Sequence, residues 1–441
     1  MMEYSRHNIF SKMAGSEDFF LVNPLSRQAD VLGPDEARAY EEGRFLEDPE
    51  FIEKGYVVDR DREARKFRQA YLDFMDERDN DEIQLFFVPW YACNFACSYC
   101  FQDEYAPQTG RLQPEVVDAF FAYVDQHFAG RRKYLTLFGG EPLLPGKAQR
   151  ESIALLLEGA NKRKLDVALV TNGYRLQEYI DLLEQTSIRE IQVTLDGPRE
   201  IHDARRMLKG GKGSFDRIVE GVDALLERQI PVNLRVVVDR DNLQHLPALA
   251  DFARERGWTS SPVFKTALGR NYELHHCQTA RSRLFSRLEM YEELYKMVEA
   301  HPSFLDFHKP AFSIAAHLFD SGEMPHPLFD SCSGTKTEWA FDYTGQIYAC
   351  TATVGNAGDE LGTFYPEVVL KEDSIELWED RDVMAIEACR DCSVQLACGG
   401  GCAAIARSKS GKLQGPDCRP VKSLLELGIG LYSRLPLETE Q

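Results

Sequence analysis

Three cysteines, Cys93, Cys97 and Cys100, follow directly after an apolar run and constrain the fold more than any other feature of this chain. The run, residues 83–90, has the length and apolar character of a buried β-strand. Three thiolates on one short loop can bind three irons of a cubane iron–sulfur cluster and leave the fourth iron without a protein ligand. Because an open iron can take a substrate or cofactor, the C-x3-C-x2-C spacing predicts chemistry at this loop. A zinc site or a chance cluster of buried thiols is the alternative, although zinc sites usually present paired C-x2-C knuckles.

The composition is typical of a cytoplasmic enzyme. With 441 residues, of which 44% are hydrophobic, the chain can bury a large core divided among two or three domains. We expect neither a transmembrane helix nor a secretory signal, because no long apolar stretch appears and the first residues are polar. The eleven cysteines, many at ligand-like spacings, then indicate metal or cluster ligation in a reducing cytoplasm. A net charge of −20 argues against a nucleic-acid partner.

The middle of the chain alternates apolar strand-like runs with segments of helical period. The expected strands are residues 83–90, 134–138, 167–170, 190–195, 232–238 and 262–268. The expected helices are residues 114–128, 150–164, 176–184, 214–228 and 243–256. This order predicts an α/β fold with a parallel sheet and right-handed crossovers. Six units, rather than eight, predict a partial (β/α)6 TIM-like barrel with its ligands at the carboxyl ends of the strands.

Short polar motifs follow these strands. Gly139-Gly140-Glu141-Pro142 comes after the second strand, where two glycines would let the backbone approach a ligand and Glu141 would add a negative charge. Thr171-Asn172-Gly173 follows the third strand and Asp196 the fourth. Plain turns are the alternative for these motifs, and Ser214 is typical of a helix N-cap.

The cysteine motif, with Tyr99 before its last cysteine, and the Gly-Gly-Glu-Pro motif resemble the radical S-adenosylmethionine (SAM) superfamily. Residues 194–206 and 213–216 resemble the subfamily that includes anaerobic sulfatase-maturating enzymes. This resemblance implies a catalytic [4Fe–4S] cluster on Cys93, Cys97 and Cys100, and SAM as the second cofactor. It places Glu141 at the methionine ammonium and Arg206 at the SAM carboxylate. The SAM-binding residues that it implies are Tyr99, Gly139, Gly140, Glu141, Pro142, Asn172, Asp196 and Arg206.

The C-terminal third carries seven further cysteines in a recognisable order. They are Cys332, Cys350, Cys389, Cys392, Cys398, Cys402 and Cys418. Their order resembles the SPASM domain, which carries two auxiliary iron–sulfur clusters, so the chain would hold three [4Fe–4S] clusters in all. The resemblance assigns Cys389, Cys392, Cys398 and Cys418 to the distal cluster and the remaining three to the nearer one. A pair of zinc ribbons is the alternative.

Cys277 is the eleventh cysteine and has no assigned partner. Sulfatase-maturating enzymes have a fourth near-cluster ligand shortly before the position of Cys332, and residues 322–330 contain no cysteine. Cys277 could complete that cluster, or the cluster could keep an open iron that binds a substrate thiolate. A buried, unreactive thiol is the third alternative.

The N-terminal segment precedes the expected barrel. Residues 19–22 and 29–32 predict two strands around a turn, and residues 55–59 predict another short strand. Hairpin, helices and strand resemble the small winged-helix-like peptide-recognition module of ribosomal-peptide maturases, which binds a leader peptide at a strand edge. A cap on the barrel is the alternative. Residues 60–81 predict a charged helix and linker with a solvated face.

These observations predict four regions: a peptide-recognition module at residues 1–81, a radical SAM barrel at 82–270, a helical linker at 271–330 and a SPASM domain at 331–441. The resemblance implies an oxidoreductase that abstracts a hydrogen atom from a peptide or protein with a 5′-deoxyadenosyl radical. A thioether or carbon–carbon crosslink in a ribosomal peptide is the expected product. The expected partners are the precursor peptide and an electron donor such as a flavodoxin or ferredoxin, with no membrane partner.

Two other functions are alternatives. The first is an anaerobic sulfatase-maturating enzyme that forms formylglycine. In those enzymes an aspartate, the proposed base, follows the cysteine equivalent to Cys350, whereas Thr351 stands there in this chain. The second is an iron–sulfur electron-transfer protein, which would need no SAM pocket.

Overall fold

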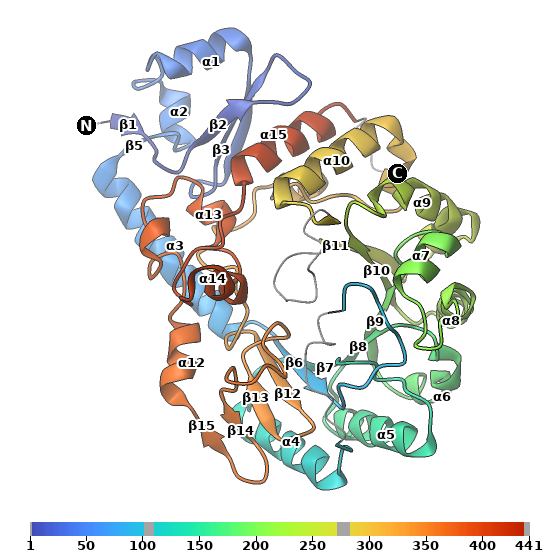
Figure 1. Ribbon diagram of the computed structural model, residues 1–441. Helices are drawn as coiled ribbons and strands as arrows, with labels where there is room; N and C mark the ends of the chain where they lie inside the picture. Colours follow the sequence, from blue (N-terminus) through green and yellow to red (C-terminus); the bar gives the residue numbers. More distant parts are fainter. Residues whose placement is uncertain (1, 101–109, 271–282, 436–441) are drawn as a thin grey trace.

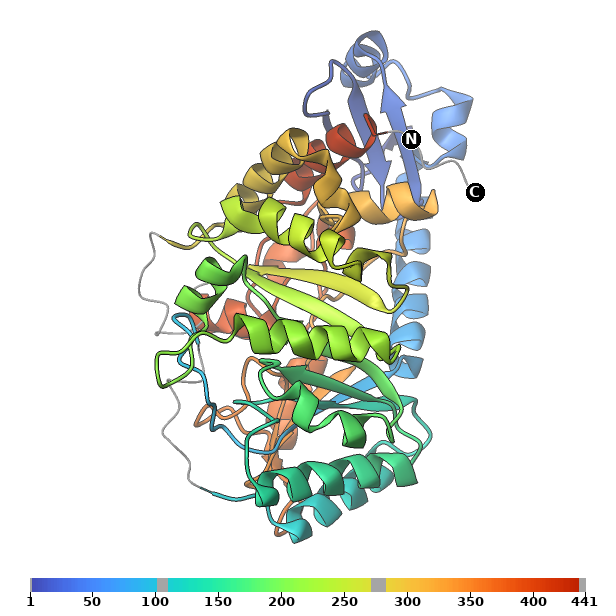
Figure 2. The same cartoon turned by 90° about the vertical axis from the view of Figure 1, so that its right-hand side faces the viewer.

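A computed structural model of the protein describes residues 2–100, 110–270 and 283–435. Its centre is a ten-stranded sheet in the order β11-β10-β9-β8-β7-β6-β12-β13-β14-β15. Helices cover the outer side of this curved sheet, and the N-terminal segment forms a separate lobe at one end (Figure 1; Figure 2).

Six neighbouring strands of the sheet run parallel and follow one another in chain order, as the sequence predicts. They are β6 (Ile83–Val88), β7 (Lys133–Leu137), β8 (Val167–Thr171), β9 (Ile188–Thr194), β10 (Val232–Val238) and β11 (Phe264–Arg270). Most apolar side chains of β6 to β10 are buried, as expected for strands covered on both faces, whereas those of β11, at the edge of the sheet, are half-buried. The largest difference from the predicted bounds is at β11, which begins and ends two residues later.

The helices between the strands match the predicted alternation. They are α4 (Pro114–His127), α5 (Lys147–Lys162), α6 (Ile180–Leu183), α7 (Arg199–Arg205), α8 (Phe215–Glu227) and α9 (Leu246–Glu255). The helix predicted over residues 176–184 is instead a 3-10 turn, η2 (Leu176–Glu178), followed by α6, and α9 begins after a similar turn, η3 (Leu243–His245). Helix α7 had no prediction of its own; it places Arg205 and Arg206 at the strand ends.

The C-terminal third continues the same sheet. Strand β12 (Glu338–Asp342) pairs in parallel with β6, and β13 (Gln346–Tyr348) pairs antiparallel with β12 as a hairpin. Strands β14 (Gly362–Thr363) and β15 (Val369–Leu370) extend it, so the whole sheet is mixed. The helices and turns that follow are α12 (Glu372–Glu379), η7 (Glu387–Cys389), α13 (Gln395–Cys398), α14 (Ala403–Ser410) and α15 (Val421–Tyr432).

Between β11 and β12 the described chain is helical. It forms α10 (Arg287–Ala300), the 3-10 turn η6 (Pro302–Asp306) and α11 (Ala315–Ser321). Another short 3-10 turn, η4 (Trp258–Ser260), lies just before β11. Helices α10 and α11 both pack on α15. Among the described residues, none of the helices combines the length and the apolar character that a membrane span requires.

The N-terminal lobe contains two small sheets. Strands β2 (Ile9–Lys12), β3 (Phe19–Asn23) and β4 (Gln28–Leu32) form an antiparallel sheet, and β1 (Met2–Tyr4) pairs with β5 (Val57–Asp59). The predicted strands at β3, β4 and β5 are confirmed, whereas β1 and β2 had not been predicted. Helices α1 (Pro34–Glu41) and α2 (Pro49–Glu53) complete the lobe.

Helix α3 (Arg60–Asn80) runs along one side of the molecule from this lobe toward β6 (Figure 1). The sequence predicted a solvated helix here. In the structure one face of α3 packs against the C-terminal region, since Phe67, Tyr71 and Phe74 surround the fully buried ring of Phe329. The hydroxyl of Tyr71 also donates a hydrogen bond of 2.7 Å to Asp382. The predicted solvated face is therefore only part of this helix.

Candidate active site at the carboxyl ends of the strands

The loop that carries Cys93, Cys97 and Cys100 leaves the carboxyl end of β6. Its backbone is held by the last residue of α7 and the chain just after it, because Ala96 N–H donates to Met207 O (2.9 Å) and Ser98 N–H donates to Arg205 O (3.0 Å). The residue just before the loop, Tyr91, donates a 2.8 Å hydrogen bond to Asp342 at the end of β12. The loop is thus fixed from two sides before any cofactor is considered.

The Gly-Gly-Glu-Pro motif lies directly against this loop. A Cβ atom on Gly140 would stand 2.2 Å from the carbonyl oxygen of Ala92, and one on Gly139 would stand 2.8 Å from that of Trp90. Gly139 also has a φ of 137°, which side chains rarely adopt. The close approach of the two backbones explains both glycines, and Pro142 follows as a buried residue of the same turn.

The carboxylate of Glu141 joins the second and third strand ends. It is buried and accepts hydrogen bonds from Thr171 Oγ1 (2.6 Å), Asn172 N (2.6 Å) and Leu143 N (2.8 Å). Burial raises the pKa of Glu141, and these bonds oppose the shift. Asn172 in turn donates to Asn94 Oδ1 (2.8 Å), next to Cys93. Glu141 therefore has an evident structural role, and its contact with a methionine ammonium stays a prediction.

A second set of polar side chains joins the loop of Cys93, Cys97 and Cys100, called here the cluster loop, to the end of the fourth strand, β9. The hydroxyl of Tyr99 donates to Asp196 Oδ2 (2.6 Å) and accepts from Arg206 Nη1 (2.7 Å). Arg205, which had no assigned role, binds Asp196 Oδ2 (3.2 Å) and Asp239 Oδ1 (2.7 Å). Asp196 and Asp239 follow two different strands, so no local pattern in the sequence connects them to Arg205. The one signal for Arg205 was its place beside Arg206.

The residues at this site fit the implied cofactors. The Nε of Arg206 is buried and has no hydrogen-bond partner among the described residues, so it can donate to a carboxylate such as that of SAM. Burial, with smaller effects from Glu141, Cys97 and Cys100, raises the pKa of Cys93 to about 12, so the three thiols lie within electrostatic reach of one another. In the described part of the chain, no three His, Cys, Asp or Glu side chains are grouped as ligands of a single metal ion. A cubane cluster is larger than one ion, and its thiolates stand further apart.

The C-terminal cysteines form two groups according to which thiols influence one another's pKa. Burial raises the pKa of Cys350, with smaller effects from Glu338, Cys332 and Cys402. Burial raises the pKa of Cys389 to about 11, with smaller effects from Cys398, Cys392 and Cys418. These groups have the same members as the two predicted ligand sets, whose roles stay predictions. Cys277 lies outside the described residues.

Comparison with known proteins agrees with this geometry. Residues 87–253 match the radical SAM superfamily. The chain is 27% identical over 356 residues to the mycofactocin maturase MftC of Mycobacterium tuberculosis, covering 78% of this chain and 84% of the relative. It is 25% identical over 324 residues to the serine-type anaerobic sulfatase-maturating enzyme of Klebsiella aerogenes, covering 71% of this chain and 77% of the relative.

Two solved structures share the fold. The protein anSMEcpe with bound AdoMet superposes with a TM-score of 0.63 at 18% identity, covering 80% of this chain and 100% of the other. SuiB of Streptococcus suis, bound to its precursor peptide SuiA, superposes with a TM-score of 0.55 at 14% identity, covering 96% of this chain and 99% of the other. The motifs, the fold and the sequence relatives together make this chain a radical SAM enzyme, one that uses a [4Fe–4S] cluster and SAM and is related to the mycofactocin maturase and to anaerobic sulfatase-maturating enzymes.

Proposed function

We propose that this enzyme modifies a ribosomally made precursor peptide, abstracting a hydrogen atom and forming a thioether or carbon–carbon crosslink. The observation that carries the proposal is the division of the ten described cysteines into one group at the strand ends and two in the C-terminal region. One [4Fe–4S] cluster at each group would supply reductive SAM cleavage at the first and electron transfer or thiolate binding at the other two.

The side chains of this enzyme would hold and shield these cofactors. Asp196 and Arg206 hold Tyr99, and through it the cluster loop, in one orientation. Gly139 and Gly140 let the loop approach the second strand end closely. A fixed loop and a buried Arg206 favour one bound geometry for SAM, and such pre-organisation is the main protein contribution in cofactor chemistry.

The N-terminal lobe would recognise the peptide. In the three-stranded sheet, β3 is the one described strand that is bonded to β4, so the other edge of β4 can accept an added strand. Val31 on β4 is 55% exposed, so its side chain would contact a strand added at this edge.

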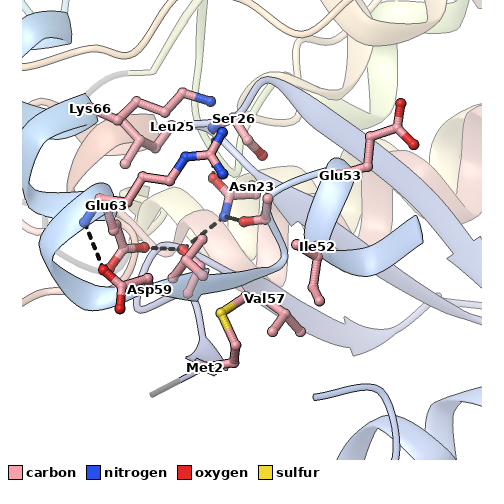
Figure 3. Close-up of a pocket in the computed structure, with 14 residues that line it drawn as sticks. Met2, Asn23, Leu25, Ser26, Ile52, Glu53, Val57, Asp59, Glu63 and Lys66 are labelled. Carbon is pink, nitrogen blue, oxygen red and sulfur yellow. Dashed lines mark hydrogen bonds between the residues drawn. The ribbon is translucent and has the colours of Figure 1, made fainter. Parts of the chain in front are cut away.

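A pocket of about 130 Å³ lies on the same lobe, between the β1–β5 pair and α3 (Figure 3). Leu25, Ile52 and Val57 give it an apolar part, and Glu63 and Lys66 lie at its charged side. Its size suits a single side chain of a bound leader. Peptide binding by the solved relative SuiB agrees with this role.

Formylglycine formation is the second candidate, favoured by the sulfatase-maturating relative. The backbone N–H of Thr351 donates to Glu338 (2.9 Å), and threonine has no basic side chain to accept a proton. The crosslinking proposal does not need a base at this position.

Anaerobic SAM cleavage tests the central proposal. Replacing Cys93, Cys97 and Cys100 together by alanine should remove about four irons and abolish 5′-deoxyadenosine formation. The matched control is Ser98→Ala, in the same loop, which keeps all three thiols. A triple variant that still forms 5′-deoxyadenosine would contradict the proposal. A crosslink and a formylglycine made from serine both remove two hydrogens, so the mass of the whole peptide after turnover does not separate them. Tandem mass spectrometry does, because a crosslink suppresses fragmentation between the two joined residues, whereas only the aldehyde of formylglycine reacts with a hydrazide.

A further inference from the structure

A second, larger pocket of about 430 Å³ lies between the barrel and the C-terminal region. Its walls come from the carboxyl half of β11, the first turns of α10, residues 311–314 and the start of α15. In Figure 1, α10 and α15 lie side by side, close to β11. The apolar part of its lining consists chiefly of Leu268, Met290, Tyr291, Ile314 and Leu424.

Within the described residues, the charged side chains that line the pocket are basic. They are Arg270, Arg287 and Arg419, and no acidic residue among those described lines it. This is unexpected for a chain with a net charge of −20. Three guanidinium groups around one partly apolar cavity repel one another, and an anion held among them would relieve that repulsion.

The described contacts of Arg287 and Arg419 leave donors for a ligand. Arg270 Nη1 donates to Phe285 O at 2.6 Å, which holds its side chain in place. Arg287 lies 4.0 Å from Asp417, a carboxylate that Lys409 also approaches at 3.3 Å. The Nε of Arg419 is buried, and within the described residues it has no hydrogen-bond partner. A buried donor without a partner is costly, so a ligand that accepts from it would be stabilised.

The pocket continues the line of polar groups at the active site. Arg270 pairs with Val238 across the sheet, and Asp239, the next residue, binds Arg205 of the active site. On its other side, Ala397 and Arg419 are the neighbours of Cys398 and Cys418 in one C-terminal cysteine group. A molecule in the pocket would therefore lie between the strand ends and that cysteine group.

We infer that this arginine pocket binds a carboxylate of the peptide substrate, from an acidic side chain or from the peptide's C-terminus. The inference rests on the proposed function, because it names the chemical group that the enzyme would hold while the peptide is modified. A planar carboxylate accepts two hydrogen bonds from a guanidinium, and the apolar walls suit the carbon chain that carries it.

The alternative role for these arginines is to balance the negative charge of an iron–sulfur cluster bound at the neighbouring cysteines. It would involve Arg419, which adjoins Cys418, more than Arg287. For this reason Arg287 is the residue to vary, and the visible absorption of the clusters reports whether the variant still loads iron.

Three capped tripeptides test the inference on the cluster-loaded enzyme by saturation-transfer difference NMR. Acetyl-Ala-Ala-Ala-amide has no carboxylate, acetyl-Ala-Ala-Ala has a terminal one, and acetyl-Ala-Asp-Ala-amide has one on a side chain. We expect at least one carboxylate peptide to bind about tenfold more tightly than the neutral one, as a charge-assisted hydrogen bond provides. The carboxylate peptide that binds more tightly identifies whether the pocket takes a C-terminal or a side-chain carboxylate.

Variants locate the binding. Arg287→Gln should remove most of the carboxylate preference, and Arg287→Lys should restore part of it. Ser313→Asp, which adds a negative charge to the lining, should weaken binding without touching the cysteine groups. The control Arg254→Gln, on the surface of α9 and paired with Asp251, should bind like the unaltered enzyme.

Several outcomes would overturn the inference: equal binding of the neutral peptide, no binding of any peptide, or no change in either Arg287→Gln or Ser313→Asp. Competition by inorganic phosphate stronger than that of the carboxylate peptides would also overturn it and indicate a phosphate site. Anaerobic 5′-deoxyadenosine formation is measured on the same samples. If the unaltered enzyme forms none, the proposed function fails, whatever the peptides do. If it forms normally and the carboxylate preference is absent, only the pocket inference fails.

Discussion

The hydroxyl of Tyr99 and the carboxylate of Asp196 share a hydrogen bond of 2.6 Å. Tyr99 belongs to the cysteine loop after β6, and Asp196 follows β9, so the bond links the carboxyl ends of two strands that are not neighbours in the sheet. Asp196 also accepts from the backbone of Val237 (2.9 Å) and from Arg205 (3.2 Å). The orientation of the cluster loop is therefore set by residues from distant strands.

Removing this bond should weaken SAM binding. Tyr99→Phe keeps the aromatic ring but leaves Asp196 and Arg206 without a shared partner, at a cost of about 1–3 kcal/mol. We expect the KM for SAM to rise by about tenfold or more, with the iron content unchanged. The control is Tyr174→Phe, since no described hydrogen bond involves the hydroxyl of Tyr174. Unchanged kinetics of SAM cleavage in Tyr99→Phe would show that the bond does not position the site.

His202 should make stability depend on pH. Burial, with a smaller effect from Arg206, lowers the pKa of His202 to about 3, and its Nδ1 accepts from the backbone of Asp196 (3.1 Å). Below about pH 6.5 the unfolded chain binds this proton and the folded protein does not, so stability is lost as the pH falls. From pH 7.5 to 5.5 this residue should lower the free energy of unfolding by about 1.4 kcal/mol.

Urea denaturation across that range measures the effect. His202→Gln should show a correspondingly smaller loss of stability on acidification, although the variant is less stable overall. His317→Gln, at an exposed position, is the control and should behave like the unaltered protein. Parallel pH curves for His202→Gln and the unaltered protein would be inconsistent with a buried neutral imidazole.

Phe329 should join α3 to the C-terminal region. Its ring is fully buried and lies within 5.2 Å of the rings of Phe67 and Tyr71, measured between centroids. Phe329→Ala should lower the free energy of unfolding by about 3–5 kcal/mol, as deletion of a buried aromatic ring does. Limited proteolysis should then release the segment before β6 more rapidly. Leu72→Ala, on the exposed face of α3, is the control and should change neither measurement.

The C-terminal cysteine groups should load iron independently. Replacing Cys332, Cys350 and Cys402 together by alanine should remove about four irons, and so should replacing Cys389, Cys392, Cys398 and Cys418. Both variants should retain 5′-deoxyadenosine formation without peptide, because the first cysteine group lies on a different loop. Iron analysis and electron paramagnetic resonance measure the outcome. Loss of twice that iron in either variant would mean that the two groups form one site.

Cys277→Ala tests the near C-terminal group further. If Cys277 is its fourth ligand, this variant should change the resonance spectrum of the cluster. If the iron is open, the spectrum should stay the same, and a cysteine-containing peptide should perturb the unaltered enzyme while its Cys→Ser counterpart does not. The four spectra are those of the unaltered enzyme and of Cys277→Ala, each with and without peptide. If none of them changes, Cys277 is not a ligand and the iron does not bind a substrate thiolate, which leaves outer-sphere electron transfer as the role of the cluster.

The sequence by itself determined the local features of this protein. Apolar runs predicted all six parallel strands, each with bounds within two residues, because burial on both faces of a sheet requires such runs. Spacing predicted the cysteine loop, since residues within one short loop cannot separate. The glycines of Gly139-Gly140 also had a local signal, and the structure adds the reason, which is contact with the carbonyl groups of Trp90 and Ala92.

The tertiary structure decided what depends on residues far apart in the chain. No periodicity shows that β12 pairs with β6, that Phe67 packs on Phe329, or that Arg205 joins Asp196 to Asp239. The charged pattern of α3 predicted a solvated helix because its aromatic residues meet their partner only after folding. The arginines of the large pocket come from a strand end, a helix start and a distant loop. Their meeting follows from how the helices pack on the sheet, and packing is a property of the whole chain.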